Sequence, residues 1–302
     1  MGLLASVVAG KALVYGVQWL PQRWHRTAEW LFVGAGAAAA IVADLSSQGP
    51  AARGLSVFLI AALPGIVAFL VWRTVLASVL VSLLPLYFGI GALTAGRTIH
   101  MPALALDRAL TVQPAWMFVY GSLYLFVLLP LLVVRQDALL HRAMKAYVMV
   151  LIVAYAGFLA YPTIAPRPVL APAVGFLAWC LRLVYALDSP YNCFPSLHVA
   201  HSFVSALACY RVHRGVGVGA ALWAAFIGVS TLYVRQHYVV DVIAGALAAS
   251  VAYALFLRSH PRQSIPESDR RLAPRRALTV AIIFGMVVAG CWVLYTTKMV
   301  VV

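Results

Sequence analysis

The sequence predicts an all-α fold, a polytopic bundle of membrane-spanning helices. Hydrophobic residues make up 64% of the 302 residues and charged residues only 10%, whereas a soluble domain carries about 25% charged residues. The apolar runs reach the roughly 20 residues that a helix needs to cross a bilayer. They do not alternate with polar residues as the strands of a membrane barrel do.

Nine apolar segments are predicted to cross the membrane. The segment 2–20 is a tenth candidate, although Lys11 at its centre fits a short or interfacial helix equally well. It has no small-residue cleavage site after its apolar part, so we do not interpret it as a cleaved signal peptide. The nine predicted spans are 28–45, 55–72, 74–96, 115–134, 145–161, 195–211, 216–234, 237–257 and 277–297.

The basic residues behind the formal net charge of +14 are concentrated in alternate segments between the predicted spans. The segments expected on the cytoplasmic side hold 14 of the 22 Lys and Arg residues. They are Arg73 and the segments 21–27, 135–145, 211–215 and 258–276. The alternate loops hold only six. Because basic loops stay on the cytoplasmic side, membrane topology accounts for this charge, and we do not predict nucleic-acid binding. The segment 258–276 is expected to be a cytoplasmic loop that could also contact anionic lipids.

Two segments on the opposite side are expected to be more than short turns. The first, 97–114, contains Asp107 between two prolines and leads into an aromatic span end at Trp116 and Tyr120, which is typical of a membrane interface. The second, 162–194, contains an apolar stretch at 173–187. That stretch predicts a re-entrant or interfacial helix, either a lid over the outer opening or an ordinary connector.

The four cysteines do not form the pattern of a disulfide framework. Cys180 and Cys193 lie on the predicted outer side and could pair, whereas Cys209 and Cys291 lie elsewhere. Buried free thiols are the simpler interpretation. No Cys-x-x-Cys pair suggests a zinc site.

A histidine and an aspartate stand four residues apart at the start of the predicted span 237–257. His237 and Asp241 therefore share one face of a helix. The carboxylate can accept the Nδ1 proton of the imidazole and leave Nε2 as a nucleophile. Arg235, two residues upstream, could bind an anion. A buried His–Asp pair that only joins helices is the structural alternative.

A second histidine lies in the segment Phe194-Pro195-Ser196-Leu197-His198. Proline suits the first turn of a helix, so the N–H groups of Ser196, Leu197 and His198 are expected at a helix N-terminus, where they could bind phosphate. The Ser196 hydroxyl could donate one more hydrogen bond, and His198 could protonate a leaving oxygen. A serine cap followed by an incidental histidine is the alternative.

A third segment, Thr163-Ile164-Ala165-Pro166-Arg167-Pro168, follows the predicted span 145–161. The Arg167 guanidinium is a rigid and permanently charged fork that suits two phosphate oxygens.

These three segments resemble the signatures of the type 2 phosphatidic acid phosphatase superfamily of membrane lipid phosphatases and phosphotransferases. Arg167-Pro168 matches the end of the first signature, whose lysine position is Ala160 here; Pro195-Ser196-Leu197-His198 matches the second, with Leu for Gly. Ser230, His237 and Asp241 match the third, in which Thr231 replaces an arginine. The resemblance covers about 74 to 257.

The resemblance implies a role for each matched residue. His237 is then the nucleophile that forms a phosphohistidine, Asp241 orients it and His198 donates the proton. The phosphate-binding residues would be Arg167, Ser196 and Leu197 together with Arg235. No metal or other cofactor is expected. A metal cluster of His198, His201, His237 and Asp241 is the alternative, but it would leave Ser196 and the arginines without a role.

The departures from the signatures point to one branch. The run 230–241 is similar to the branch that contains inositol phosphorylceramide synthases and their bacterial relatives, in which an alcohol replaces water as the acceptor. We therefore expect an enzyme that acts on a lipid phosphate or phosphodiester at the extracytoplasmic face, either as a phosphatase or as a headgroup transferase. A non-enzymatic transporter or scaffold is the alternative from another class.

The predicted organisation has three parts. Residues 1–73 form N-terminal membrane helices of unknown role, 74–257 a six-helix catalytic core, and 258–302 a basic cytoplasmic loop and a C-terminal span. The expected location is the bacterial plasma membrane, with the site facing the periplasm or exterior. The identity of the lipid, any alcohol acceptor and the oligomeric state are left open.

Overall fold

The computed structural model describes residues 85–94, 96–168, 170, 175–188 and 190–298. Residues 90–293 form one compact unit, to which the following description refers. The expected spans at 2–20, 28–45 and 55–72, and the first part of 74–96, lie outside the described residues.

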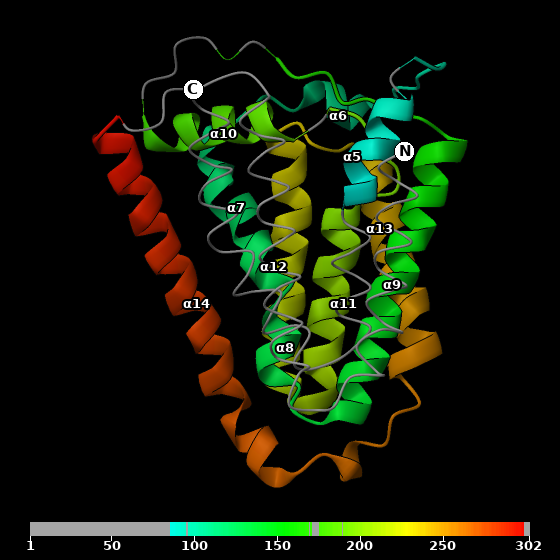
Figure 1. Ribbon diagram of the computed structural model, residues 1–302, viewed down its shortest axis with the longest axis vertical. Coiled ribbons are helices and arrows are strands. Elements are labelled where there is room, and N and C mark those ends of the chain that lie inside the picture. The colour runs from blue at the N-terminus through cyan, green and yellow to red at the C-terminus, as the bar shows by residue number, and fades with distance from the viewer. Residues whose placement is uncertain (1–84, 95, 169, 171–174, 189, 299–302) are drawn as a thin grey trace, which may run out of the picture. The chain divides into compact units, whose positions relative to one another are not determined.

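The described residues form helices, joined by loops that contain two isolated β-bridges, His100 with Thr163 and Ile164 with Tyr191 (Figure 1). Four helices are long and apolar enough to cross a membrane: 137–160, 214–233, 239–257 and 267–296. This confirms the predicted all-α membrane fold. The elements are α5 Pro85–Thr94, α6 Ala105–Ala109, η1 Pro114–Trp116, α7 Met117–Phe126, α8 Leu129–Val133, α9 Asp137–Ala160, α10 Phe176–Leu187, α11 Leu197–Val212, α12 Arg214–Tyr233, α13 Val239–Ala252, η2 Tyr253–Leu257, η3 Arg262–Ser264 and α14 Glu267–Thr296.

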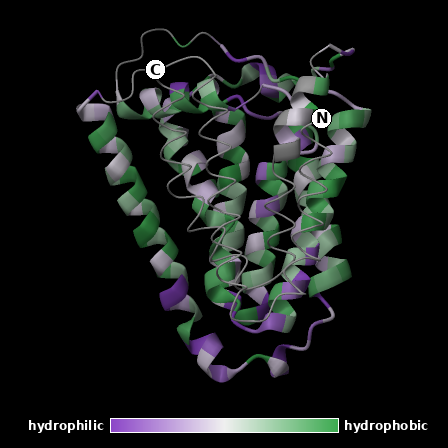
Figure 2. Ribbon diagram, in the orientation of Figure 1, coloured by the Kyte–Doolittle hydropathy of each residue, from purple (hydrophilic) through white to green (hydrophobic). Residues whose placement is uncertain are grey.

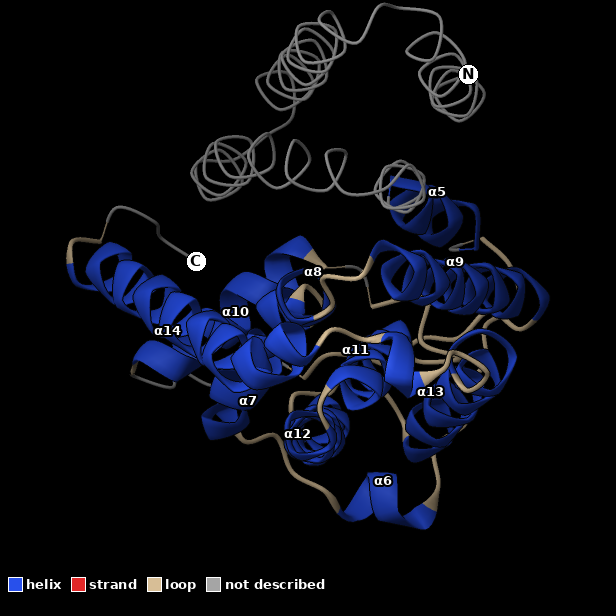
Figure 3. Cartoon of the chain, turned by 90° about the horizontal axis from the view of Figure 1, so that it is seen from below, coloured by secondary structure: helices blue, strands red, loops and turns tan. Residues whose placement is uncertain are grey.

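Helix α11 is the centre of the bundle. It packs against α7, α8, α9, α12, α13 and η2, and the end-on view shows these helices around it (Figure 3). Hydrophobic residues cover most of the helix surfaces, while hydrophilic residues gather towards the ends of the bundle (Figure 2). His198 therefore lies in the first turn of the helix that contacts the most neighbours among the described elements.

The span expected at 115–134 is interrupted, which corrects the sequence prediction. It consists of η1, α7 and α8, with a turn at residues 127–128. Pro130 has no N–H group, so the carbonyl of Phe126 lacks its partner in the helix. The Ser205 hydroxyl donates to that carbonyl (2.8 Å) and the Tyr147 hydroxyl donates to the carbonyl of Val127 (2.8 Å). Side chains from neighbouring helices thus satisfy the interrupted backbone, as the interior of a membrane requires.

The last helix also begins earlier than expected. The sequence predicts a loop through residue 276, but α14 starts at Glu267. Glu267 and Asp269 lie in its first turn, where negative charge is favourable, and Glu267 pairs with Arg271 at 2.6 Å. The basic residues of this region therefore lie largely on a helix.

Two glycines allow the site-bearing segments to approach their neighbours closely. A Cβ atom at Gly245 of α13 would lie 2.5 Å from the carbonyl oxygen of Ser196, and one at Gly157 of α9 would lie 2.6 Å from Pro195 Cδ. Both distances are too short for a side chain. The segment before α11 is therefore held between the backbones of α9 and α13.

Helix α10 fits the apolar stretch expected at 173–187. Its 12 residues are too few to span a bilayer, and Figure 1 shows it lying across the upper end of the bundle. It packs against α7 and η1. This arrangement agrees with the predicted interfacial or re-entrant helix.

Candidate active site

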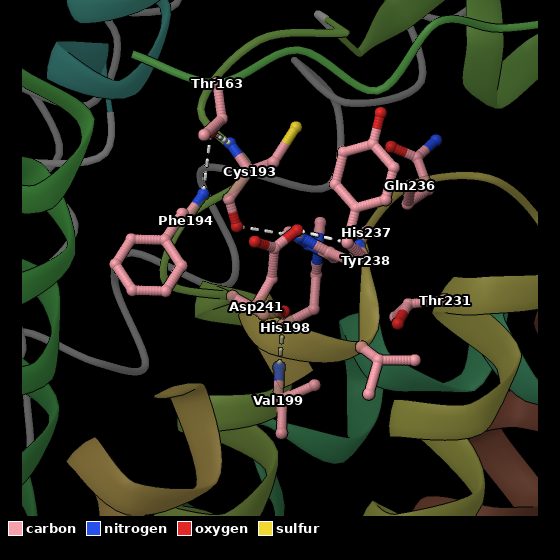
Figure 4. Close-up of polar contacts among 12 residues, drawn as sticks. Thr163, Cys193, Phe194, His198, Val199, Thr231, Gln236, His237, Tyr238 and Asp241 are labelled. Atoms are coloured by element: carbon pink, nitrogen blue, oxygen red, sulfur yellow. Dashed lines mark hydrogen bonds and ion pairs between the residues drawn. The ribbon is translucent and has the colours of Figure 1, made fainter. Parts of the chain in front are cut away.

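Hydrogen bonds join the three predicted motif segments at one end of the bundle (Figure 4). The Thr163 hydroxyl accepts the N–H groups of Cys193 (3.1 Å) and Phe194 (3.0 Å). The N–H of Ser196 donates to the backbone carbonyl of Asp241 at 3.1 Å. The Tyr238 hydroxyl donates to the carbonyl of Ile164 at 3.0 Å. Each segment is thus tied to the other two.

The two histidines singled out by the sequence are in direct contact. His198 is the second residue of α11 and His237 lies in the turn before α13. Their Nδ1 and Nε2 atoms, respectively, are 2.7 Å apart, and His237 is 6% exposed. Residues 39 positions apart therefore meet, the buried His237 with the half-buried His198.

The partners of the pair determine its protonation. His237 Nδ1 lies 2.9 Å from the carbonyl oxygen of Cys193. A carbonyl can only accept, so we assign the proton of neutral His237 to Nδ1. Its Nε2 then carries a lone pair and accepts from His198 Nδ1–H. The other nitrogen of His198 lies 3.4 Å from the Tyr120 hydroxyl.

Asp241 lies beside His237 but is not its nearest acceptor. Its Oδ2 atom is 3.5 Å from His237 Nδ1 and accepts the N–H of Tyr238 at 2.7 Å. The sequence led us to expect Asp241 to accept the Nδ1 proton from a shared helix face. However, α13 begins only at Val239, so His237 lies outside the helix, and the Cys193 carbonyl is its closer acceptor. Asp241 is fully buried, and its Oδ1 has no hydrogen-bond partner among the described residues.

Ser196 and Leu197 form the start of α11. Ser196 is the N-cap, and its hydroxyl oxygen accepts the N–H of Val199 at 3.3 Å. Leu197 is the first helical residue, so Pro195 precedes the cap instead of lying in the first turn as expected. Ser196 is completely buried. Its side chain therefore has a structural role in this conformation, as the alternative interpretation of the motif proposed.

The Arg167 guanidinium bridges two protein segments. It donates to the carbonyl of Tyr185 (3.0 Å) and to the side-chain oxygen of Gln236 (3.1 Å), and it lies 3.9 Å from Asp188. Arg167 thus connects the end of α10 to the turn that carries His237. In this conformation Arg167 donates to protein oxygens, the kind of acceptor that a phosphate would otherwise provide.

Arg235 is held by the outer segment 97–116, on which α6 lies. Its guanidinium donates to the carbonyls of Asp107 (2.8 Å) and Leu110 (2.5 Å). Its φ of 54° is in the left-handed region, which a non-glycine residue adopts at a cost. Figure 3 shows α6 at the edge of the bundle, on the side of α12 and α13. The carbonyls at the end of α6 therefore fix the Arg235 side chain.

A cavity of about 350 Å³ lies between the outer segment and the His237 turn. This volume is at the lower end of the range for ligand pockets. The charged and titratable residues of its lining are Asp107, Arg108, Arg235, His237 and Tyr238. The cavity is therefore lined by both polar and apolar residues and carries more positive than negative charge.

The four cysteines are free thiols. Cys193 is buried, and burial raises the pKa of its thiol. Its carbonyl contributes to the site, whereas its sulfur lies 3.3 Å from the carbonyl of Pro190. In the part of the chain that is described, no group of three His, Cys, Asp or Glu residues could hold a metal ion.

A family model described as the PAP2 superfamily matches residues 97–255. The chain belongs to the PAP2 superfamily. Together with helices long and apolar enough to cross a membrane, this membership indicates an integral membrane protein. The match contains the three motif segments and lies within the predicted core, 74–257.

The chain is also similar to a PA-phosphatase related-family protein of Dictyostelium discoideum. The two are 33% identical over 75 residues, which are 25% of this chain and 13% of that protein. The aligned part is thus a small fraction of the relative's length. No solved structure matches the chain.

Sequence reasoning assigned no role to three residues that organise this candidate site. Tyr120 contacts His198, Thr163 binds the segment before α11, and Asp107 binds the turn before α13. Asp107 carried a signal, because it is the one acidic residue of the segment 97–114, and a carboxylate that becomes buried needs partners. Thr163 begins the third motif segment but was given no role there, and Tyr120 was noted only as part of an aromatic span end.

Proposed function

We propose that this protein transfers phosphoryl groups from a lipid phosphate or phosphodiester through a phosphohistidine on His237. The observation that carries the proposal is the 2.7 Å contact between His237 Nε2 and His198 Nδ1, with the Cys193 carbonyl on the opposite nitrogen of His237. This pairing leaves the lone pair of a buried imidazole directed at a second imidazole that can carry a proton.

In the first step, His237 Nε2 attacks phosphorus and the bond from phosphorus to the lipid oxygen breaks. Protonated His198 gives its Nδ1 proton to the departing oxygen, so the lipid alcohol leaves neutral. The ring of His237 becomes positively charged, and Asp241, 3.5 Å from Nδ1, stabilises it. The unpartnered Oδ1 of Asp241 gives the carboxylate a further acceptor for the same proton.

In the second step, His198 accepts a proton from water or an alcohol, which attacks phosphorus. The bond to His237 Nε2 breaks, and the two histidines return to their starting states. The backbone N–H groups of Leu197 and His198, which follow the cap Ser196 at the start of α11, and the cations Arg167 and Arg235 are the proposed stabilisers of charge on the phosphoryl oxygens.

The substrate has to separate the two imidazoles. An in-line arrangement of nucleophile, phosphorus and protonated leaving oxygen places the two nitrogens roughly 7 to 8 Å apart. The contact of 2.7 Å therefore represents a closed state. We propose that His198 turns away, because its outer nitrogen makes only the long contact of 3.4 Å with Tyr120.

The site is proposed to face the extracytoplasmic side of the plasma membrane. Arg211 lies at the end of α11 opposite His198, and Arg142 donates to the carbonyl of Phe256 at the same end. Basic residues favour the cytoplasmic side, which supports the predicted topology. A bacterial source, with the site facing the periplasm or exterior, stays a proposal from the sequence.

The proposed domain plan is unchanged: a catalytic core at 74–257, membrane helices of unknown role at 1–73, and a basic segment with the last span at 258–302. The proposed reaction uses neither a metal nor another cofactor.

Release of phosphate from a panel of lipid phosphates tests the proposal. The purified full chain should release phosphate, whereas His237→Ala and His198→Ala should lose activity by factors of at least 10². Ser250→Ala is the matched control, because Ser250 is exposed and binds only its own helix. Full activity of His237→Ala would exclude this residue as the nucleophile.

A headgroup transferase is the second candidate. The cavity of about 350 Å³ favours it, because this volume corresponds to about ten waters and could accept an alcohol. The same lipid panel, incubated with a polyol or a second lipid alcohol, should then yield an exchanged lipid. If only free phosphate forms at every alcohol concentration, water is the acceptor.

A further inference from the structure

The cavity beside His237 has a wall that sequence reasoning did not include in the site. This wall is α6 with the residues before it, and it contributes Ala103, Asp107 and Arg108 to the lining. The opposite wall contributes Arg235, His237 and Tyr238. The outer segment thus completes a pocket whose lining also includes His237, the residue of the proposed nucleophile.

Asp107 fixes this wall in place. Its Oδ2 accepts the N–H of Leu104 at 2.8 Å, and its Oδ1 accepts the N–H of Val239, the first residue of α13, at 2.9 Å. Its backbone carbonyl accepts from Arg235. Asp107 is 2% exposed. One buried residue therefore joins α6 to the turn on both sides of His237.

Further contacts extend the attachment along the chain. The N–H of Gln113 donates to the carbonyl of Tyr233 at 3.1 Å, and the ring of Trp116 stacks on that of Tyr233 with centroids 5.0 Å apart. At the other end, Arg97 donates to the carbonyl of Leu159 at 2.6 Å. The segment 97–116 is thus a fixed part of the site.

Arg108 follows Asp107 and has no comparable attachment. It is exposed, and its side chain makes no hydrogen bond or ion pair with any described residue. By contrast, Arg167 and Arg235 both use guanidinium donors on protein carbonyls. Among the cations of the cavity lining, Arg108 is the one whose donors are all available to a ligand.

We propose that Arg108 is a binding residue for a phosphate group in the His237 cavity. A phosphate monoester carries up to two negative charges, and a guanidinium binds two of its oxygens at once. The Asp107 carboxylate in the same lining does not compete, because both of its oxygens accept backbone N–H groups. This inference rests on the proposed function, and the ligand can be a lipid phosphate or free inorganic phosphate.

Two measurements on the full chain in neutral detergent test the proposal. The first is the KM and kcat for dioctanoyl phosphatidic acid, and the second is the equilibrium binding of inorganic phosphate, which needs no turnover. The variants are Arg108→Gln and Arg108→Lys. Leu106→Gln is the matched control, because Leu106 is 55% exposed on the same short helix and does not line the cavity.

Arg108→Gln should raise the KM and the dissociation constant of phosphate about tenfold, as expected for the loss of one charge-assisted contact. Its kcat should stay within about twofold, because the lost contact serves binding. Arg108→Lys should recover part of the loss, and Leu106→Gln should leave both constants unchanged.

The outcomes separate this inference from the proposed function. If Arg108→Gln leaves both constants within about twofold of wild type, Arg108 does not bind phosphate. If its effect appears only in vesicles with anionic lipid and not in neutral detergent, Arg108 contacts the membrane surface and the proposal fails. Phosphate binding that depends on Arg108 in a protein without turnover would support the anion site while contradicting the phosphotransfer reaction.

Discussion

Replacement of Asp107 tests whether the outer segment is part of the catalytic apparatus. Asp107→Ala removes the acceptor for two backbone N–H groups, those of Leu104 and Val239. An unsatisfied buried donor costs about 1–3 kcal/mol and the loss of a helix cap about 1 kcal/mol. Because Leu104 is exposed and can bind water, we expect a loss of about 2–4 kcal/mol in the free energy of unfolding.

The same variant should also lower activity. Without the carboxylate, α6 loses its attachment to α13, and with it the carbonyls of Asp107 and Leu110 that hold Arg235. A displacement of about 1 Å at a catalytic site can cost a factor of about 10², so kcat/KM should fall by about one to two orders of magnitude. Asp107→Asn keeps one acceptor oxygen and should lie between wild type and Asp107→Ala in both measurements.

Unfolding in mixed micelles with increasing SDS gives the stability, and phosphate release from a lipid phosphate gives the activity. Asp137→Ala is the control, because Asp137 is an exposed carboxylate in the first turn of another helix, α9. It should cost less than about 1 kcal/mol and keep its kcat/KM. An Asp107→Ala protein that unfolds at the wild-type SDS fraction with wild-type kcat/KM would refute the reasoning.

Three further predictions concern the bundle. Gly245→Ala should lower the free energy of unfolding by about 1–3 kcal/mol, because its Cβ would lie 2.5 Å from the carbonyl oxygen of Ser196. The control Gly219→Ala should not destabilise the protein, because its Cβ would have no neighbour within 4 Å. Equal SDS unfolding curves for the two variants would contradict this prediction. Ser205→Ala should cost about 1 kcal/mol, because the carbonyl of Phe126 loses its donor, and an unchanged unfolding curve would show that another donor replaces it. Burial, together with Arg142 and Arg211, lowers the pKa of His260 in the loop after η2. The unfolded chain therefore takes up a proton first, so stability should be fully present above about pH 6.5 and fall below it. His260→Gln should flatten this dependence in thermal unfolding between pH 7 and 5, and an equally steep dependence in the variant would assign it to other groups.

The membrane fold could be predicted from the sequence because apolar length is a local property. The helices α9, α12, α13 and α14 lie at predicted spans. The interruption of 115–134 could not be predicted with the same certainty, because proline is tolerated in membrane helices when neighbours satisfy the backbone. Here those neighbours are Tyr147 and Ser205, which are distant in the sequence.

The sequence predicted which residues lie in the candidate site better than it predicted their hydrogen-bond partners. The sequence singled out His198 and His237, which the structure brings together. It assigned the Nδ1 proton of His237 to Asp241, although a backbone carbonyl, that of Cys193, lies closer. Every residue has a carbonyl, so sequence patterns do not identify such a partner. Asp107 was missed as a site residue because its contacts span more than 120 positions.

The most direct test of the account is to trap the covalent intermediate. The full chain is mixed with a lipid phosphate labelled at phosphorus, denatured in alkali within milliseconds to seconds and digested, and the labelled peptide is identified by mass spectrometry. We predict an acid-labile label on His237 that is absent in His237→Ala. A label on another residue, or turnover in wild type and His237→Ala at equal rates, would contradict the account.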